Sequence, residues 1–188
     1  ENPFDSVVFD GDGSWTFYDS LWANEVFWLK KGHVNTNSQN CRAYNFLSYT
    51  NTNRSLTLGA TIFDFNRVWR LKSDNFTMNA GTSSLRFSGP GVFRTEGNNN
   101  VDYHEVWFES AFGLTNLWVD ANTTVTYNKV IFNGHADING EHTFDTLVFM
   151  PGNQYKLEKG LTQTIVGDWI ARGNNCFPIT IQSSQLGQ

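Results

Sequence analysis

Two aspartates at alternate positions in a glycine-rich turn are the first residues whose types fit metal chemistry. The segment Asp10-Gly-Asp-Gly13 places the carboxylates of Asp10 and Asp12 in one loop, as a Ca²⁺ site would require. It lacks the further oxygen ligand and the closing glutamate of a helix–loop–helix calcium site. A turn rich in Gly and Asp accounts for the same residues, so we expect no cofactor and keep calcium at Asp10 and Asp12 as a hypothesis.

Histidine and acidic side chains gather in a second segment, residues 134–142 (GHADINGEH). In an extended chain His135 and Asp137 point to one side, and a turn at Asn139-Gly140 could fold His142 back toward them. Imidazole and carboxylate groups together can hold Zn²⁺. The segment is also a polar link between two apolar runs, where solvated side chains are expected, and we favour that interpretation.

Acid catalysis would need a pair of carboxyl groups about 5–10 Å apart. Glu105 and Glu109 lie in one segment, share strand parity and are flanked by His104 and Trp107. Nothing distinguishes them from ordinary surface acids, and a lyase would also need a basic side chain nearby. We therefore predict no catalytic residues and no enzyme activity.

Carbohydrate binding without catalysis has better support, because exposed aromatic rings stack on sugar faces. Most of the seven tryptophans should lie in the core, given the area that each one buries. Trp69 and Trp118 alternate with polar neighbours, and Trp107 lies in the same segment as His104, Glu105 and Glu109. These three tryptophans are the candidates for glycan stacking.

The two cysteines, Cys41 and Cys176, are far apart in the sequence and form no metal-type cluster. One disulfide bond between them and two free buried thiols are both consistent with the sequence.

Composition restricts the class of protein. The net charge of −5 gives no basic footprint for nucleic acid, and no apolar run is long enough to insert into a membrane. An aromatic content of 15% argues against disorder. The polar residues are mostly Asn, Thr and Ser, which favour turns and strands over helices.

The apolar runs are short and predict strands. Each run of four to eight residues ends at Gly, Asn or Asp, as in Ser6–Phe9 before DGDG and Ser55–Leu58 before Gly59. The segment Ser20–Gly32 carries helix-like end signals, but its Val, Phe and Trp residues favour a strand. We expect an all-β fold.

A repeated phrase indicates how these strands are arranged. Tyr127–Phe132 (YNKVIF) and Phe144–Phe149 (FDTLVF) state one pattern twice, with looser echoes starting at Tyr44, Phe65 and Tyr103. A second echo relates Leu56–Ile62 to Phe76–Thr82. A period near twenty predicts a stack of similar coils that bury a continuous core. We predict that residues 1–188 form a single right-handed parallel β-helix-like solenoid; a β-sandwich is the alternative.

Several phrases resemble a module of very large surface proteins of Bacteroidota. They are LTLGATIFDF (56–65), NFTMNAGTSSLRFSG (75–89), Pro151-Gly152, Tyr155, Gly160, TQTI (162–165) and PITIQSS (178–184). The resemblance implies a β-helical fold, export by the type IX system, and display on the surface of gliding or surface-attached bacteria. It implies no catalytic residues. The C-terminal sorting domain of type IX cargo has no counterpart here.

The same resemblance brings in O-glycosylation, because Bacteroidota modify Asp–Ser/Thr–aliphatic triplets. Ser6, Ser20 and Thr146 each stand in such a triplet. We expect a secreted, non-catalytic structural or adhesive module of a cell-surface adhesin. Its expected partners are neighbouring domains of the same large protein, and polysaccharide or glycan. The alternative is a carbohydrate-binding or polysaccharide-degrading module of a secreted enzyme.

Overall fold

The computed structural model describes residues 3–185, and within this range the chain forms sixteen β-strands and no helix. The strands are β1 (Phe4–Thr16), β2 (Leu21–Asn35), β3 (Cys41–Ser48), β4 (Arg54–Thr57), β5 (Ile62–Lys72), β6 (Phe76–Asn79), β7 (Ser84–Phe87), β8 (Val92–Glu96), β9 (Val101–Phe108), β10 (Leu114–Val119), β11 (Val125–Phe132), β12 (His135–Asn139), β13 (His142–Phe149), β14 (Gln154–Leu157), β15 (Gln163–Ala171) and β16 (Thr180–Ser183).

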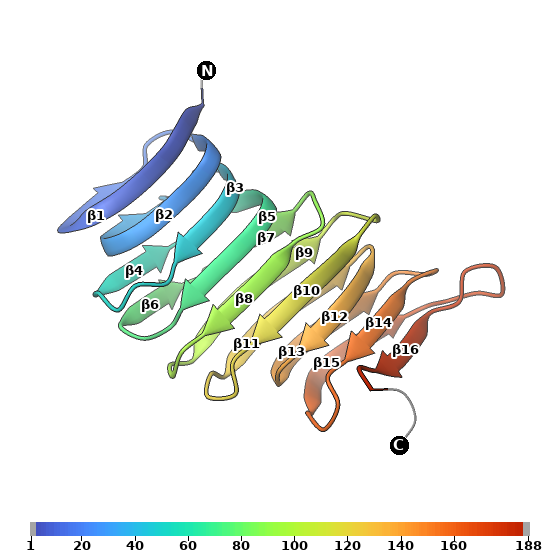
Figure 1. Cartoon of the computed structure of the whole chain (residues 1–188). Helices are drawn as coiled ribbons and strands as arrows, with labels where there is room; N and C mark the ends of the chain where they lie inside the picture. The colour runs from blue at the N-terminus through green and yellow to red at the C-terminus, as the bar shows by residue number, and fades with distance from the viewer. Residues whose placement is uncertain (1–2, 186–188) are drawn as a thin grey trace.

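All strand pairs are parallel, and each strand pairs with strands about one coil away along the chain. The chain winds as a right-handed solenoid of about eight turns, with its N-terminal coil at one end and β15 and β16 at the other (Figure 1). The prediction of a β-solenoid is therefore confirmed, and a β-sandwich is not formed.

Each coil contributes to three stacks of strands. The first stack contains β7 and the C-terminal halves of β9, β11, β13 and β15. The second contains β8, β10, β12, β14 and β16, which run side by side in Figure 1. The third contains β4 and β6 and the N-terminal halves of β9, β11, β13 and β15. The long strands β2 and β5 bend from one stack into the next.

Ladders of aromatic rings fill the interior, because equivalent side chains of successive coils point inward above one another. In the first stack Phe108 lies between Phe87 and Phe132, with ring centroids 4.9 and 4.8 Å away. In the third stack Tyr127 lies between Tyr103 and Phe144, at 5.5 and 5.3 Å. Tyr127 and Phe144 are register partners. Each copy of the repeated phrase is thus the segment in which one coil passes from the third stack into the first.

The upstream echoes do not align in the same way. Phe65 pairs with Ala43 and not with Tyr44, which is exposed. The Phe65 ring contacts Phe87 in the first stack, whereas Tyr103 lies in the third. In the second echo, Leu56 pairs with Met78 instead of Phe76. These registers differ from the predicted ones because the turns between strands vary in length.

Candidate functional site

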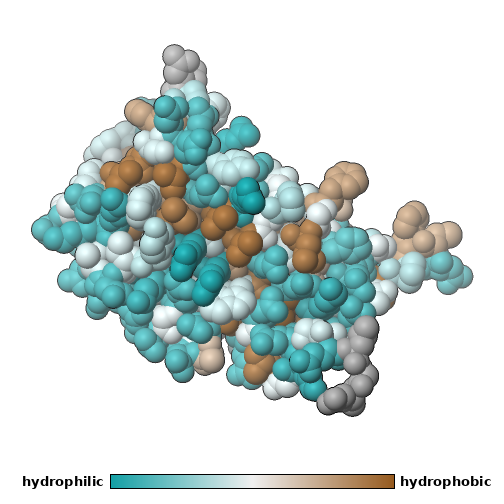
Figure 2. Space-filling model, in the orientation of Figure 1, coloured by the Kyte–Doolittle hydropathy of each residue, from teal (hydrophilic) through white to brown (hydrophobic). Residues whose placement is uncertain are grey.

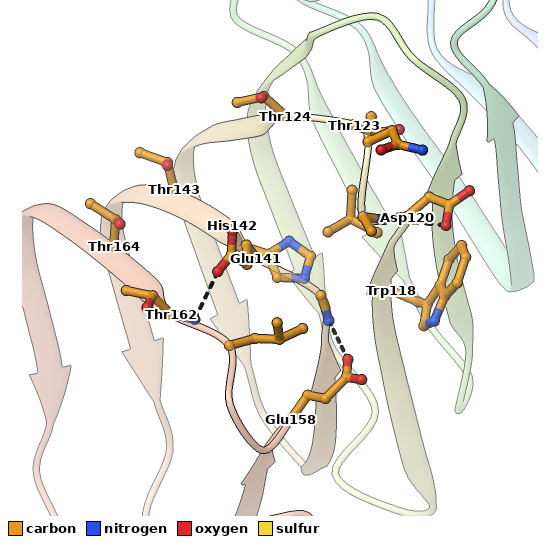
Figure 3. Close-up of a pocket in the computed structure, with 15 residues that line it drawn as sticks. Trp118, Asp120, Thr123, Thr124, Glu141, His142, Thr143, Glu158, Thr162 and Thr164 are labelled. Carbon is orange, nitrogen blue, oxygen red and sulfur yellow. Dashed lines mark hydrogen bonds between the residues drawn. The ribbon is translucent and has the colours of Figure 1, made fainter.

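A groove of about 550 Å³ lies where three strands of the second stack turn into the third (Figure 3). The turn between β10 and β11 spans residues 120–124, the turn between β12 and β13 only 140–141, and the turn between β14 and β15 spans 158–162. The short middle turn between two longer ones leaves the surface hollowed. The short turn depends on Gly140, which has a φ of +91°, a conformation that side chains rarely adopt.

The two long sides of the groove differ in chemistry. Trp118 and Asp120 stand on one side, and a row of hydroxyls from Thr124, Thr143 and Thr164 lies opposite (Figure 3). Thr143 and Thr164 are register partners on β13 and β15, one strand spacing apart, whereas Thr124 lies in the turn before β11. The groove therefore offers an aromatic ring on one side and hydrogen-bonding groups on the other.

Two of the acidic side chains of the groove accept hydrogen bonds from the backbone of neighbouring turns. Glu158 Oε2 accepts from the Gly140 amide at 2.7 Å, and Glu141 Oε1 accepts from the Thr162 amide at 3.2 Å (Figure 3). These bonds tie adjacent coils together. Both carboxylates thus position the turns that form the groove.

His142 belongs to the floor of the groove and is almost fully buried. Its Nε2 lies 3.0 Å from the Asn139 carbonyl, and its Nδ1 lies 3.3 Å from the Tyr127 hydroxyl. A neutral ring that donates from Nε2 and accepts at Nδ1 satisfies both contacts. Burial lowers the pKa of His142 to about 4, so the ring is neutral at pH 7 and acts as a core residue.

The three predicted tryptophans lie in three different environments. Trp118 is half-buried at the groove, with the Arg94 guanidinium 3.9 Å from its ring centroid. Trp107 is half-buried on the outer side of the first stack, beneath Arg86, and its Nε1 donates to Asn133.

The prediction for Trp69 is wrong, because this side chain is completely buried. Its ring stacks on Phe46 with a centroid distance of 4.0 Å, and its Nε1 donates to the Tyr103 hydroxyl. No glycan can reach a ring enclosed in this way.

Of the two alternatives for the cysteines, the structure has free thiols and no disulfide; Cys41 is buried, but Cys176 is exposed. Cys41 lies on β3, six pairing steps from β15 along the order β3-β5-β7-β9-β11-β13-β15, and Cys176 follows β15. At about 4.8 Å per step, the separation along the stack is roughly 29 Å. A disulfide needs Cα atoms within about 7 Å of each other.

The candidate metal ligands at Asp10, Asp12, His135 and Asp137 have other partners. Asp10 pairs with Lys30 and Asp12 with Lys31, at 3.7 and 2.6 Å. Asp137 faces Lys156, while His135 accepts a hydrogen bond from the Gln154 amide. Across residues 3–185, no three His, Cys, Asp or Glu side chains come together as a metal site would require.

Glu105 and Glu109 likewise have partners. Glu105 accepts a hydrogen bond from the Ser84 hydroxyl at 2.7 Å and pairs with Lys129, and Glu109 pairs with Arg86. Among the glycosylation candidates, Ser6 and Ser20 are exposed, whereas Thr146 is half-buried and donates to the Asp145 carboxylate. Both serines are accessible for modification.

Comparisons of the chain with models of known protein families, with curated proteins and with solved structures give no match. The part of the chain that the structure describes has no helix with the length and hydropathy needed to cross a membrane.

Proposed function

We propose that this chain is a non-catalytic structural and adhesive module of a bacterial cell-surface adhesin, and that the groove beside Trp118 contacts glycan. The observation that carries this proposal is the pairing of a half-buried indole at the groove with threonine hydroxyls on its opposite side. Sugars present an apolar ring face and a rim of hydroxyls. An aromatic side chain can stack on the first while hydroxyl groups bind the second.

The surrounding fold favours binding over turnover. Parallel strands with ring ladders beneath them hold the groove walls in place, so little ordering is needed when a ligand binds. The carboxylates of Glu141 and Glu158 accept backbone hydrogen bonds. This role fits a binding groove better than a site for acid catalysis.

The cell-surface assignment rests on the resemblance to surface proteins of Bacteroidota and on the polar surface. We propose that neighbouring domains of the same large protein are partners of this module, with export and surface display as the setting. The exposure of apolar side chains on the coil of β15 and β16 favours a neighbouring domain that packs against this end. Trp169 on β15 and Ile181 on β16 occupy positions whose equivalents in earlier coils are buried, yet they are 50% and 40% exposed.

The test is binding of the chain to an immobilised panel of polysaccharides, repeated with Trp118→Ala. Loss of one stacking ring should weaken binding about tenfold or more. Trp22→Ala is the matched control, because Trp22 is an exposed tryptophan outside the groove. Equal affinity of the wild type and Trp118→Ala for every polymer bound would contradict the proposal. Release of oligosaccharides would instead support the polysaccharide-degrading alternative.

A further inference from the structure

One column of outward-facing side chains crosses five coils on the outer surface of the second stack. The register pairs Trp28 with Leu47, Leu47 with Arg70, Arg70 with Arg94, and Arg94 with Trp118. The four steps between Trp28 and Trp118 span roughly 19 Å at the spacing of parallel strands. Figure 2 views this face and shows a band of hydrophobic side chains with strongly hydrophilic ones directly beside it.

The column has a tryptophan at each end, with Leu47 and two neighbouring arginines between them. Trp28 stacks on Tyr49 with a centroid distance of 5.7 Å, and the Arg70 guanidinium lies 4.9 Å from the Tyr49 ring. At the other end, the Arg94 guanidinium lies 3.9 Å from the ring of Trp118. We call Trp28, Tyr49, Arg70, Arg94 and Trp118 the aromatic–arginine row.

The centre of the row carries more positive than negative charge. Glu96 is the acidic partner of both arginines, at 3.1 Å from Arg70 and 2.9 Å from Arg94. One carboxylate shared by two guanidinium groups leaves one positive charge, in a chain whose net charge is −5. Both arginine side chains are about 40% exposed, at 41% and 39%. In addition, Arg94 Nε is a buried donor with no acceptor within residues 3–185.

We propose that the aromatic–arginine row binds an extended polysaccharide that carries carboxylate groups, lying along the solenoid axis. A sugar ring stacks on Trp118 at one end, and carboxylates of the polymer pair with Arg70 and Arg94. Trp28, whose ring already contacts Tyr49 and the Lys30 ammonium, borders the row at the other end. Guanidinium groups bind carboxylates through two parallel hydrogen bonds, which makes arginine well suited to this role. The inference rests on the proposed glycan-contacting function, with which it shares Trp118, and adds the class of ligand and the surface that recognises it.

The experiment compares two polymers with the same backbone: polygalacturonate and its fully methyl-esterified, neutral form. The wild-type chain is expected to bind the acidic polymer at least tenfold more tightly, and added salt should reduce this preference. Arg70→Gln and Arg94→Gln should each remove most of the preference. Arg42→Gln is the matched control, because Arg42 is exposed on β3 outside the row.

A variant that binds more tightly than the wild type provides a test that misfolding cannot mimic. Glu96→Gln removes the carboxylate that competes for both arginines and is expected to strengthen binding of polygalacturonate several-fold. Misfolding cannot produce that result. The proposal for the row would be wrong if both arginine variants kept the preference for the acidic polymer, or if Glu96→Gln bound polygalacturonate more weakly. If the chain bound both polymers equally and Trp118→Ala abolished that binding, the proposal for the row would be wrong and the groove proposal would stand. If the chain bound no polysaccharide, both proposals would be wrong.

Discussion

At the scale of single residues, polar side chains enter the core only where neighbouring coils provide partners. Arg54 is the clearest case, since it is 2% exposed and its guanidinium donates to carbonyl oxygens of Ser48, Thr52, Lys72 and Asp74. These acceptors come from more than one coil. A buried guanidinium with satisfied donors therefore ties coils together, whereas the same group without partners would strongly destabilise the fold.

His142 leads to a prediction about pH. Burial lowers its pKa to about 4 from an ordinary value of 6.5, so the unfolded chain binds a proton between these values while the folded chain does not. This contribution to stability is complete above pH 6.5 and is lost as the pH falls toward 4, by roughly 3 kcal/mol in total. Urea unfolding at pH 7 and pH 4.5 measures the change.

The variant His142→Gln cannot titrate, so its stability should depend less on pH across this window than that of the wild type. His33→Gln provides the control, because it makes the same substitution at a histidine that is exposed on β2. If the wild type and His142→Gln lost equal stability on acidification, His142 would not be the group responsible.

At the scale of elements, the turns between strands decide how the coils stack. A Cβ on Gly140 would lie 2.4 Å from both the Cγ1 atom and the carbonyl oxygen of Val119 in the preceding coil, whereas one on Gly160 would meet nothing within 4 Å. Both glycines have positive φ, +91° and +79°. Gly160→Ala should therefore cost only backbone strain of about 1–2 kcal/mol. Gly140→Ala should cost about 1–3 kcal/mol more, because the adjacent coil must move.

Chemical unfolding followed by tryptophan fluorescence compares the two alanine variants directly. Equal costs would mean that the turn at Gly140 can relax away from Val119 without disturbing the stack. Gly140→Ala should also weaken glycan binding if the short turn forms the groove, whereas Gly160→Ala should not.

The stacking of coils could be predicted from the sequence, but the register could not be predicted throughout. The phrases at Tyr127 and Phe144 belong to consecutive coils, joined through β12 by the two-residue links 133–134 and 140–141, so their spacing directly reflects the fold. Upstream, longer turns of differing length shift the spacing, and the Leu56 echo is displaced by two residues from its true partner, Met78. The residues at which each strand ends and pairs depend on the packing of neighbouring coils, which a single sequence does not reveal.

Strand parity explains which tryptophan prediction failed. In Trp69-Arg-Leu-Lys72 the charged Arg70 and Lys72 share one parity, so Trp69 and Leu71 take the inner side. In Leu117-Trp-Val119 the aliphatic residues take the inner side, which leaves Trp118 outside. Parity was thus sufficient for both side chains. The groove itself was not predictable, because Glu158 and Thr164 line it together with Trp118 only when coils two turns apart are stacked.

At the scale of the whole molecule, the solenoid is held together by contacts between adjacent coils. Interior coils are paired on both sides, whereas no strand within residues 3–185 pairs with the outer edges of β15 and β16. The apolar residues of this last coil are correspondingly exposed, including Val166 at 71% and Trp169 at 50%. Stability in such a stack is a sum of neighbour interactions, so the terminal coils, which contain β1 at one end and β15 and β16 at the other, are less stable than interior coils.

Hydrogen exchange of the isolated chain should therefore follow the order of the coils. Hydrogen-bonded amides of β15 and β16 are expected to exchange faster than those of β9 and β11, because opening the last coil breaks only one interface. Exchange measured by mass spectrometry of peptides resolves these strands. Equal protection in all four strands would mean that the stack opens as a single unit.

In a longer chain that includes the neighbouring domain, protection of β15 and β16 should rise toward that of β11, because the exposed Trp169 would then be covered. Unchanged fast exchange there would contradict the proposal that a neighbouring domain packs against this end.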